Sequence, residues 1–313
     1  MTILCGESAA ELFTAAARQV LAHGSPAAPR GMSTKEVLGV QLHLTEPRRR
    51  LIHLPPVRVL NPAFAVAEAI WIISGSDAPW IFDFNAQLVQ YADEGVLQGA
   101  YGPRLRRWHG VDQLDRARRQ LLADPQSRRA VISLFDPVRD HSGHTDVPCT
   151  LGFRFFLRDN QLHMHTTMRS QDLWLGFGYD IFTFTLIQEL MAGWLGVEIG
   201  PYRHCVDSLH LYAQHWEAAA MLPAHGYGEA MAPLAVAWEE LDNTLAAVVA
   251  TDLPTLGDTG WGTFAQVMRG YRWWKAGDRD TARADATKIP GLAGDALRAW
   301  YEYLAPAEAV MPR

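Results

Sequence analysis

The chain has 313 residues, of which 49% are hydrophobic and 20% charged, which is enough to bury a substantial core. Its formal net charge of -6 argues against a nucleic-acid partner, whose binding surface would be basic, but is compatible with a local basic pocket for one phosphate. The sequence contains no apolar run near the roughly 20 residues that cross a bilayer, and its first residues lack the basic flank of a signal peptide. We therefore expect a soluble cytoplasmic protein without a membrane partner.

Hydrophobic periodicity predicts the elements of the first half of the chain. The dipeptide Asn61-Pro62 is expected to begin a helix, because a proline costs little in the first helical turn. The apolar body of this helix is expected to be buried except for Glu68. The predicted elements are a helix over 8–23, a Gly/Pro/Ser-rich loop over 24–33, a strand over 37–44 and the helix over 61–73.

The second half contains a predicted hairpin and a long apolar segment. Asp159-Asn160 is typical of a turn between two strands, and residues 179–195 are apolar around most of the helix circumference, which indicates a buried helix. The other elements are a strand over 130–135, the hairpin strands over 151–157 and 162–168, a strand over 202–212 and mainly helical segments from His215 onward. The fold class is therefore α+β, with a central sheet, a long buried helix and peripheral helices, in a single domain over 1–313.

The chain has three cysteines, Cys5, Cys149 and Cys205. This odd, sparse set without a CxxC spacing argues against a disulfide framework or a zinc site, and the 12 histidines show no metal-ligand spacing. Each cysteine is thus either a buried small residue or a reactive thiol.

Cys149 follows Pro148, which rigidifies the backbone before the thiol, and arginines flank it in sequence. Arginine pairs two phosphate oxygens at once, so Arg128, Arg129 and Arg169 would bind a phosphorylated substrate and depress the pKa of the thiol together. The alternative for the Arg128-Arg129 pair is a solvated surface position.

Several motifs together resemble the thymidylate synthase family. The runs RSQDLWLGFGYD, residues 169–180, and DSLHLY, residues 207–212, are similar to its core signature. Glu68-Ala-Ile-Trp resembles its catalytic glutamate helix, Tyr101-Gly102 its tyrosine-glycine turn, and Arg30 its mobile phosphate arginine. The resemblance covers about 28–220, and the helical part from about 220 departs from the family.

This resemblance implies a thymidylate-synthase-like mixed sheet and a homodimer that uses 5,10-methylenetetrahydrofolate and a pyrimidine nucleoside monophosphate. It implies that Cys149 adds to carbon 6 of the base and that Glu68 organises water and moves protons. The remaining implied roles are phosphate binding by Arg30, Arg169 and Ser170, with Arg128 and Arg129 reaching in from the partner subunit, sugar binding by His210 and Tyr212, folate binding by Asp172 and Gly176, and support of the site by Tyr101.

One departure concerns base reading. The base-reading asparagine of thymidylate synthases falls on Asp180 here. An asparagine donates and accepts, which matches uracil, whereas a carboxylate only accepts and so matches the 4-amino group of cytosine. The alternative is a neutral exchange at a residue that only supports folding.

A second departure concerns the folate side. Thr150 replaces the histidine that follows the family nucleophile, and residues 85–101 lack the usual tryptophan pair. A looser folate site would let water, rather than hydride, add to the new exocyclic methylene, which gives a 5-hydroxymethyl group. Both departures, and residues 101–106, resemble the deoxycytidylate hydroxymethylase branch.

We therefore expect a dCMP 5-hydroxymethylase. Arg128-Arg129 and Arg169-Ser170 are intact and follow the deoxynucleotide pattern, which favours dCMP over CMP. A CMP hydroxymethylase of nucleoside-antibiotic biosynthesis is a close alternative, because a single side chain can accommodate or exclude the hydroxyl that distinguishes the two sugars. A dUMP-methylating thymidylate synthase and a catalytically silent nucleotide-binding protein are the remaining readings.

Overall fold

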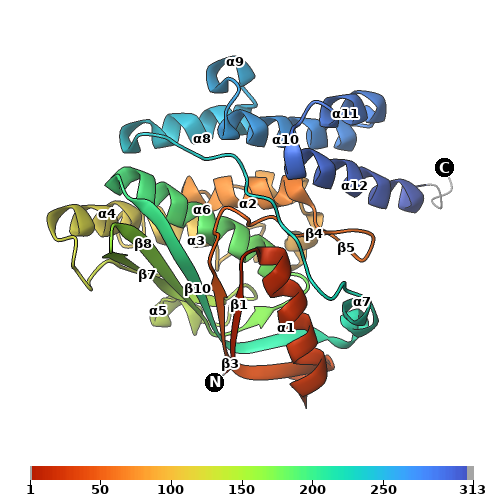
Figure 1. Ribbon diagram of the computed structural model, residues 1–313, viewed down its shortest axis with the longest axis horizontal. Helices are drawn as coiled ribbons and strands as arrows, with labels where there is room; N and C mark the ends of the chain where they lie inside the picture. Colours follow the sequence, from red (N-terminus) through yellow and green to blue (C-terminus); the bar gives the residue numbers. More distant parts are fainter. Residues whose placement is uncertain (1, 309–313) are drawn as a thin grey trace.

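The computed structural model describes residues 2–308 and has a mixed sheet at its centre (Figure 1). The strands of this sheet are β1 (Thr2–Gly6), β2 (Ser25–Ala27), β3 (Thr34–Leu44), β6 (Val131–Ser133), β7 (Thr150–Arg158), β8 (Gln161–Met168), β9 (Gln171–Asp172) and β10 (Glu198–Tyr212). Their order is β1-β3-β10-β8-β7-β6, with β2 paired to β3 and β9 to β10. A separate small hairpin joins β4 (His53–Leu54) and β5 (Arg58–Val59).

The long strand β10 organises the sheet because it pairs antiparallel with β3 and parallel with β8 and β9. The predicted hairpin is confirmed as β7 and β8, which pair antiparallel. Its turn residues Asp159 and Asn160 both have positive φ, 51° and 58°, a conformation that Asp and Asn tolerate in tight hairpin turns. As a result, the start of β7 and the end of β8 lie side by side.

Two buried helices, α2 (Pro62–Ile73) and α6 (Phe177–Leu195), pack against each other next to the sheet. Asn61 caps α2, since its side chain accepts the backbone N–H groups of Ala63 and Phe64, each at 3.1 Å. Every residue of α2 is buried except Glu68, as the sequence predicted. Glu68 is therefore the one polar residue of this helix and also the one that packing does not fully cover.

The remaining helices surround this centre. In Figure 1, α1 lies against the sheet near β1 and β3, and the C-terminal helices form a layer above α2, which α8, α10 and α12 contact. The helices are α1 (Ala9–His23), α3 (Tyr101–Arg106), α4 (Gln113–Ala123), α5 (Pro137–Asp140), α7 (Trp216–Ala220), α8 (Leu241–Ala250), α9 (Leu253–Leu256), α10 (Gly260–Lys275), α11 (Arg279–Ala286) and α12 (Gly291–Glu308). Short 3₁₀ turns occur at Pro29–Gly31, Pro79–Asp83, Ala86–Tyr91, Ala213–His215 and Trp238–Glu240. The α+β class with a long buried helix is thus confirmed.

Buried ion pairs fix the helices that carry site residues. Arg104 of α3 donates to both carboxylate oxygens of Asp140, at 2.7 and 2.6 Å, and to the carbonyl of Leu134 at 2.6 Å. Arg50 pairs with Glu189 of α6, and both side chains are almost fully buried. These pairs hold α3 and α6 in place, because an unpaired charge at such depth would be very costly.

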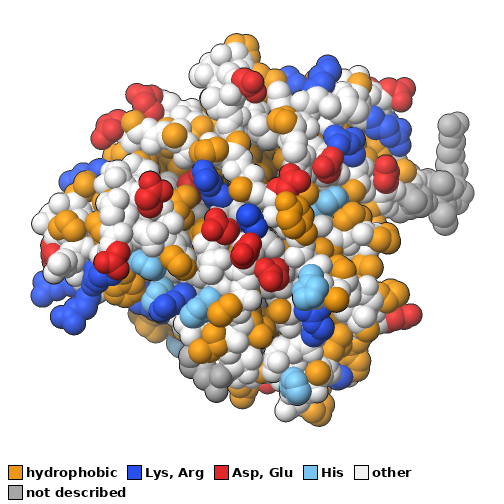
Figure 2. Space-filling view, viewed as in Figure 1, with side chains coloured by type: hydrophobic (Ala, Val, Ile, Leu, Met, Phe, Trp, Pro, Cys, Tyr) orange, Lys and Arg blue, Asp and Glu red, His pale blue; other side chains and the backbone are white. Residues whose placement is uncertain are grey.

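On the face shown in Figure 2, acidic and basic side chains are interspersed, and several histidines lie in its lower half. None of the helices in the described residues is long and apolar enough to cross a membrane.

Candidate active site

Cys149 lies directly before β7, where Arg169, directly after β8, holds the backbone around it. The Arg169 N–H donates to the Cys149 carbonyl at 2.9 Å. Its guanidinium donates through Nε to the Pro148 carbonyl at 2.9 Å and through Nη2 to the Val147 carbonyl at 3.0 Å. Pairing of β7 with β8 therefore places a cationic side chain beside the thiol.

The pKa of Cys149 nevertheless differs from the sequence expectation. Burial raises the thiol pKa, and Arg169 offsets this only partly, with a smaller contribution from Arg30. Arg169 thus lowers the pKa of the thiol as expected, but burial outweighs it, so the expectation of a net depressed pKa is wrong. The physical reason is that the thiol is largely desolvated, while Arg169 is exposed and already donates to backbone carbonyls.

Tyr101 of α3 supports the start of β7. Its hydroxyl accepts hydrogen bonds from the backbone N–H of Thr150 at 3.2 Å and from the Thr150 hydroxyl at 3.1 Å. Thr150 is fully buried, so the residue after the nucleophile is part of the packing and not of an open face. The pKa of Tyr101 is raised well above its usual value by burial, and further by the charges of Asp180 and Cys149.

Two carboxyl groups, Asp180 and Glu68, lie in the same site. Asp180 is in the first turn of α6, where its Oδ2 accepts a hydrogen bond from Gln171 Nε2 at 2.8 Å. Burial raises the pKa of Asp180 to about 7, and the Gln171 hydrogen bond opposes this rise. Burial also raises the pKa of Glu68 well above its usual value, with the charge of Asp180 as the second cause. The packing of α2 against α6 thus brings together two carboxyl groups whose pKa values are raised, and the charge of Asp180 also acts on Cys149.

The predicted phosphate residues divide into two groups. Arg30 lies on an exposed turn with a positive φ of 54°, within electrostatic reach of Cys149, and Ser170 directly follows Arg169. Arg128 and Arg129 are exposed before β6, and Arg129 lines a shallow groove along α4. Neither of these two is among the charges that act on Cys149 of the same chain.

The residues predicted to bind the sugar lie on β10, and Asp172, which is predicted to bind the folate, lies on the neighbouring strand β9. His210 pairs in register with Asp172 of β9, and its ring lies perpendicular to that of Tyr212, with centroids 5.3 Å apart. One carboxylate oxygen of Asp172 accepts the N–H groups of Trp174 and Leu175, at 2.8 and 3.0 Å, and thereby shapes the turn into α6. Gly176 follows in this turn.

Sequence reasoning missed Gln171 and His204. Gln171 bridges Asp180 and His204, and the distance from Gln171 Oε1 to His204 Nε2 is 2.9 Å. The available signal was the alternation of β10, which puts Tyr202 and His204 on one buried face. A buried polar pair of this kind requires hydrogen-bond partners.

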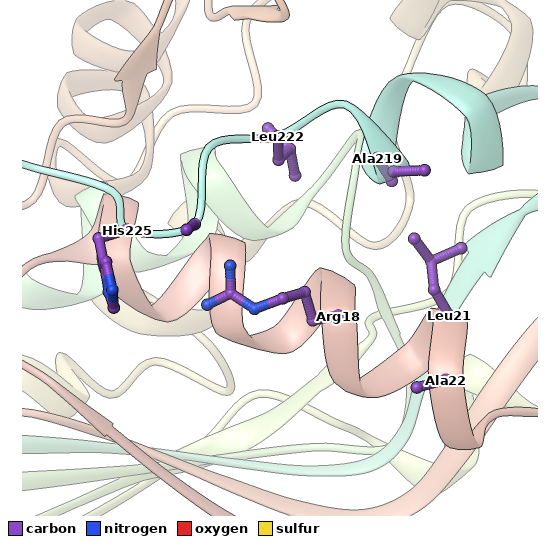
Figure 3. A pocket seen from close by; sticks show the side chains of 8 residues that line it. Arg18, Leu21, Ala22, Ala219, Leu222 and His225 are labelled. Carbon is purple, nitrogen blue, oxygen red and sulfur yellow. The ribbon is translucent and has the colours of Figure 1, made fainter.

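A surface depression between α1 and the segment after α7 is lined mainly by apolar side chains, including Leu21, Ala219 and Leu222 (Figure 3). Arg18 crosses it and donates to the Pro223 carbonyl at 3.3 Å. None of the candidate site residues lines it. Within residues 2–308, no cluster of three or more His, Cys, Asp or Glu side chains could hold a metal ion.

The sequence was also compared with the models of known protein families and with curated proteins. The family model of thymidylate synthase matches residues 11–236, and the chain therefore belongs to the thymidylate synthase family. The helices α8 to α12 lie beyond the matched region.

Two curated relatives carry the name deoxyuridylate hydroxymethyltransferase. The protein of Bacillus phage SP01 is 36% identical over 233 residues, which cover 70% of this chain and 61% of the relative. The protein of Delftia phage PhiW-14 is 34% identical over 188 residues, which cover 55% of this chain and 52% of the relative. The match thus spans between half and two thirds of the length of these relatives.

Proposed function

We propose that this protein is a pyrimidine nucleotide 5-hydroxymethylase that acts on dCMP, with 5,10-methylenetetrahydrofolate as the one-carbon donor. The observation that carries the choice of base is the buried carboxyl of Asp180, at the family's base-reading position and in the electrostatic neighbourhood of Cys149 and Glu68. The 4-amino group of cytosine donates to a carboxylate, whereas the 4-carbonyl of uracil is repelled by it.

Cys149 is the nucleophile in this proposal. Its sulfur adds to carbon 6 of the base, which makes carbon 5 nucleophilic and ring nitrogen 3 more basic. Asp180, with a pKa of about 7, can hold or release the proton that nitrogen 3 shares as the thiolate adds. Because burial raises the pKa of Cys149 above its usual value, the thiol carries its proton near neutral pH and must lose it for the sulfur to add to the base.

Glu68 is the proton carrier in this proposal. Glu68 is the one partly exposed residue of the buried helix α2, and no hydrogen bond to its carboxyl forms within residues 2–308. A carboxyl with a raised pKa can take the proton from carbon 5 and return it to a leaving group. Arg30, Arg169 and Ser170 would hold the phosphate.

The folate would lie beside Asp172 and Gly176. Within residues 2–308, only one carboxylate oxygen of Asp172 accepts backbone hydrogen bonds, and the neighbouring Leu175 is 45% exposed, so the turn into α6 offers an acceptor next to an apolar surface. When bound, 5,10-methylenetetrahydrofolate supplies one carbon, and with one water the products are 5-hydroxymethyl-dCMP and tetrahydrofolate, without net oxidation or reduction. The names of both phage relatives support a hydroxymethyl product.

A second candidate substrate is dUMP, because both relatives are named deoxyuridylate hydroxymethyltransferases. Protonated Asp180 could donate to the uracil 4-carbonyl, and its pKa of about 7 makes this form available near neutral pH. We place dCMP first because the ionised form, which dominates above this pKa, favours cytosine alone.

The test is a turnover panel of dCMP, CMP, dUMP and UMP, each tritiated at carbon 5, with methylenetetrahydrofolate. We expect folate-dependent tritium release that is fastest for dCMP, a product heavier by one CH₂O unit, and no dihydrofolate absorbance. Faster turnover of dUMP than of dCMP would overturn the choice of base, and faster turnover of CMP than of dCMP would overturn the choice of sugar. Formation of dihydrofolate would indicate a methylating synthase.

A further inference from the structure

A chain of buried side-chain hydrogen bonds begins at Asp180 and runs under the sheet face. Gln171 Nε2 donates to Asp180 Oδ2 at 2.8 Å, and Gln171 Oε1 lies 2.9 Å from His204 Nε2. His204 Nδ1 lies 2.8 Å from the Tyr202 hydroxyl, which lies 2.8 Å from the Thr166 hydroxyl. Gln171 is 2% exposed, and the other three supporting side chains are completely buried.

The orientation of the Gln171 amide determines which group donates and which accepts in each hydrogen bond of this series. Gln171 Nε2 also lies 3.3 Å from the backbone carbonyl of Asp172, which can only accept a hydrogen bond. The reversed amide would place two oxygens against each other there and would require a proton on Asp180 Oδ2. The amide nitrogen therefore faces Asp180, and the amide oxygen faces His204.

The tautomer of His204 follows from its burial and its two hydrogen-bond partners. Burial lowers the pKa of His204 to about 3, so its ring is neutral and has one donor and one acceptor nitrogen. Because Gln171 Oε1 only accepts, His204 carries its proton on Nε2, and Nδ1 accepts from Tyr202. Hydroxyl groups rotate to suit their partners, so Tyr202 donates its one proton to His204 Nδ1 and accepts a hydrogen bond from Thr166.

Gly176 leaves the space in which the Gln171–Asp180 hydrogen bond forms. A Cβ on residue 176 would lie 2.9 Å from Gln171 Nε2 and 3.4 Å from Asp180 Oδ2. The backbone there has φ −99°, which an alanine can adopt, so its Cβ would displace the Gln171 amide and make only an ordinary van der Waals contact with Asp180 Oδ2.

We propose that Gln171, held by His204, is a positioning residue that fixes Oδ2 of Asp180 as a hydrogen-bond acceptor and thereby sets the preference for cytosine over uracil. This proposal rests on the proposed function only in that Asp180 reads the base. The Gln171 hydrogen bond to Oδ2 favours the ionised form of Asp180, which only accepts hydrogen bonds. Loss of this bond would favour the protonated form, which can donate to the uracil 4-carbonyl.

The test compares His204→Phe with His204→Gln. Phenylalanine keeps the ring that packs against Phe177 and Phe184 but removes the Nε2 donor, whereas glutamine keeps an Nε2–H donor. We expect the ratio of kcat/KM for dCMP to that for dUMP to fall about tenfold in His204→Phe, the effect of one hydrogen bond. We expect His204→Gln to stay within about twofold of the wild type. An unchanged ratio in a folded His204→Phe protein would overturn the proposal.

A second measurement does not depend on turnover. Long-range ¹H–¹⁵N spectra of the full-length wild-type protein, with His204→Gln to assign the signals, should show a neutral His204 protonated on Nε2. Gln171→Met should shift these signals, and Gly176→Ala should do so through steric displacement of the amide. A Nδ1-protonated ring would overturn the proposal, whereas a wild type that turns over no pyrimidine nucleotide would contradict the proposed function alone.

Discussion

Glu68 of α2 and Asp180 of α6 are close enough that the charge of Asp180 raises the pKa of Glu68. Both carboxyls are already hard to ionise because helix packing removes most of their water. A protein that needed these positions only for stability would fill them with apolar side chains. We therefore propose that the pair handles protons, and three of the predictions below concern it.

Glu68→Gln should separate catalysis from stability. We expect turnover to fall by about 10²- to 10⁴-fold, since glutamine cannot carry a proton. Because folding raises the pKa of Glu68, wild-type stability decreases as pH rises from the unfolded value of 4.5 toward the folded one, and glutamine removes this slope. Urea unfolding at pH 5 and pH 8 should therefore show the variant gaining on the wild type with pH. Equal slopes in the two proteins would contradict the rise in the pKa of Glu68 on folding.

Asp180→Asn should move the base preference toward uracil. With Gln171 donating to the asparagine oxygen, the asparagine amide nitrogen would face the base and donate to the uracil 4-carbonyl. We expect the ratio of kcat/KM for dCMP to that for dUMP to fall by at least about tenfold. An unchanged ratio would show that base choice is made elsewhere.

The sequence predicted the order of the elements well, because periodicity and turn chemistry are local. The capped helix after Asn61 and the Asp159-Asn160 turn are examples. It failed on the pKa of Cys149, since desolvation depends on packing between residues distant in sequence. It also missed His204, whose role exists only through Gln171 on the neighbouring strand. The roles assigned to the site residues themselves stay predictions.

Arg50→Met should destabilise the protein strongly. Its partner Glu189 would remain buried and unpaired, a loss of about 3–5 kcal/mol. The matched control is Arg49→Ala, which removes the neighbouring exposed ion pair with Glu7 and should cost less than about 1 kcal/mol. Urea unfolding at pH 7 measures both. Similar losses in the two variants would contradict the buried location of the Arg50–Glu189 pair.

Cys149→Ala should lower turnover of the preferred nucleotide by more than about 10⁴-fold, because no other thiol can replace the nucleophile. Nucleotide affinity should change little, since Arg169 and the arginine-held backbone remain in place. Calorimetric titration with dCMP and tritium release measure the two quantities. Cys205→Ala is the control and should leave both unchanged, because Cys205 lies in the middle of β10 and is not a candidate site residue. Turnover by Cys149→Ala near the wild-type rate would contradict the covalent mechanism.

The preference for cytosine should increase with pH. Below a pKa of about 7, Asp180 carries a proton and can donate to the uracil 4-carbonyl; above it, the carboxylate only accepts. The value of kcat/KM for dUMP, relative to that for dCMP, should therefore fall about tenfold for each pH unit above 7. Taking the ratio cancels the ionisation of Cys149 and Glu68, which both substrates share. Profiles from pH 6 to pH 9 measure the effect, and Asp180→Asn should show a flat ratio over the same range. A flat ratio in the wild type as well would mean that Asp180 does not face the base.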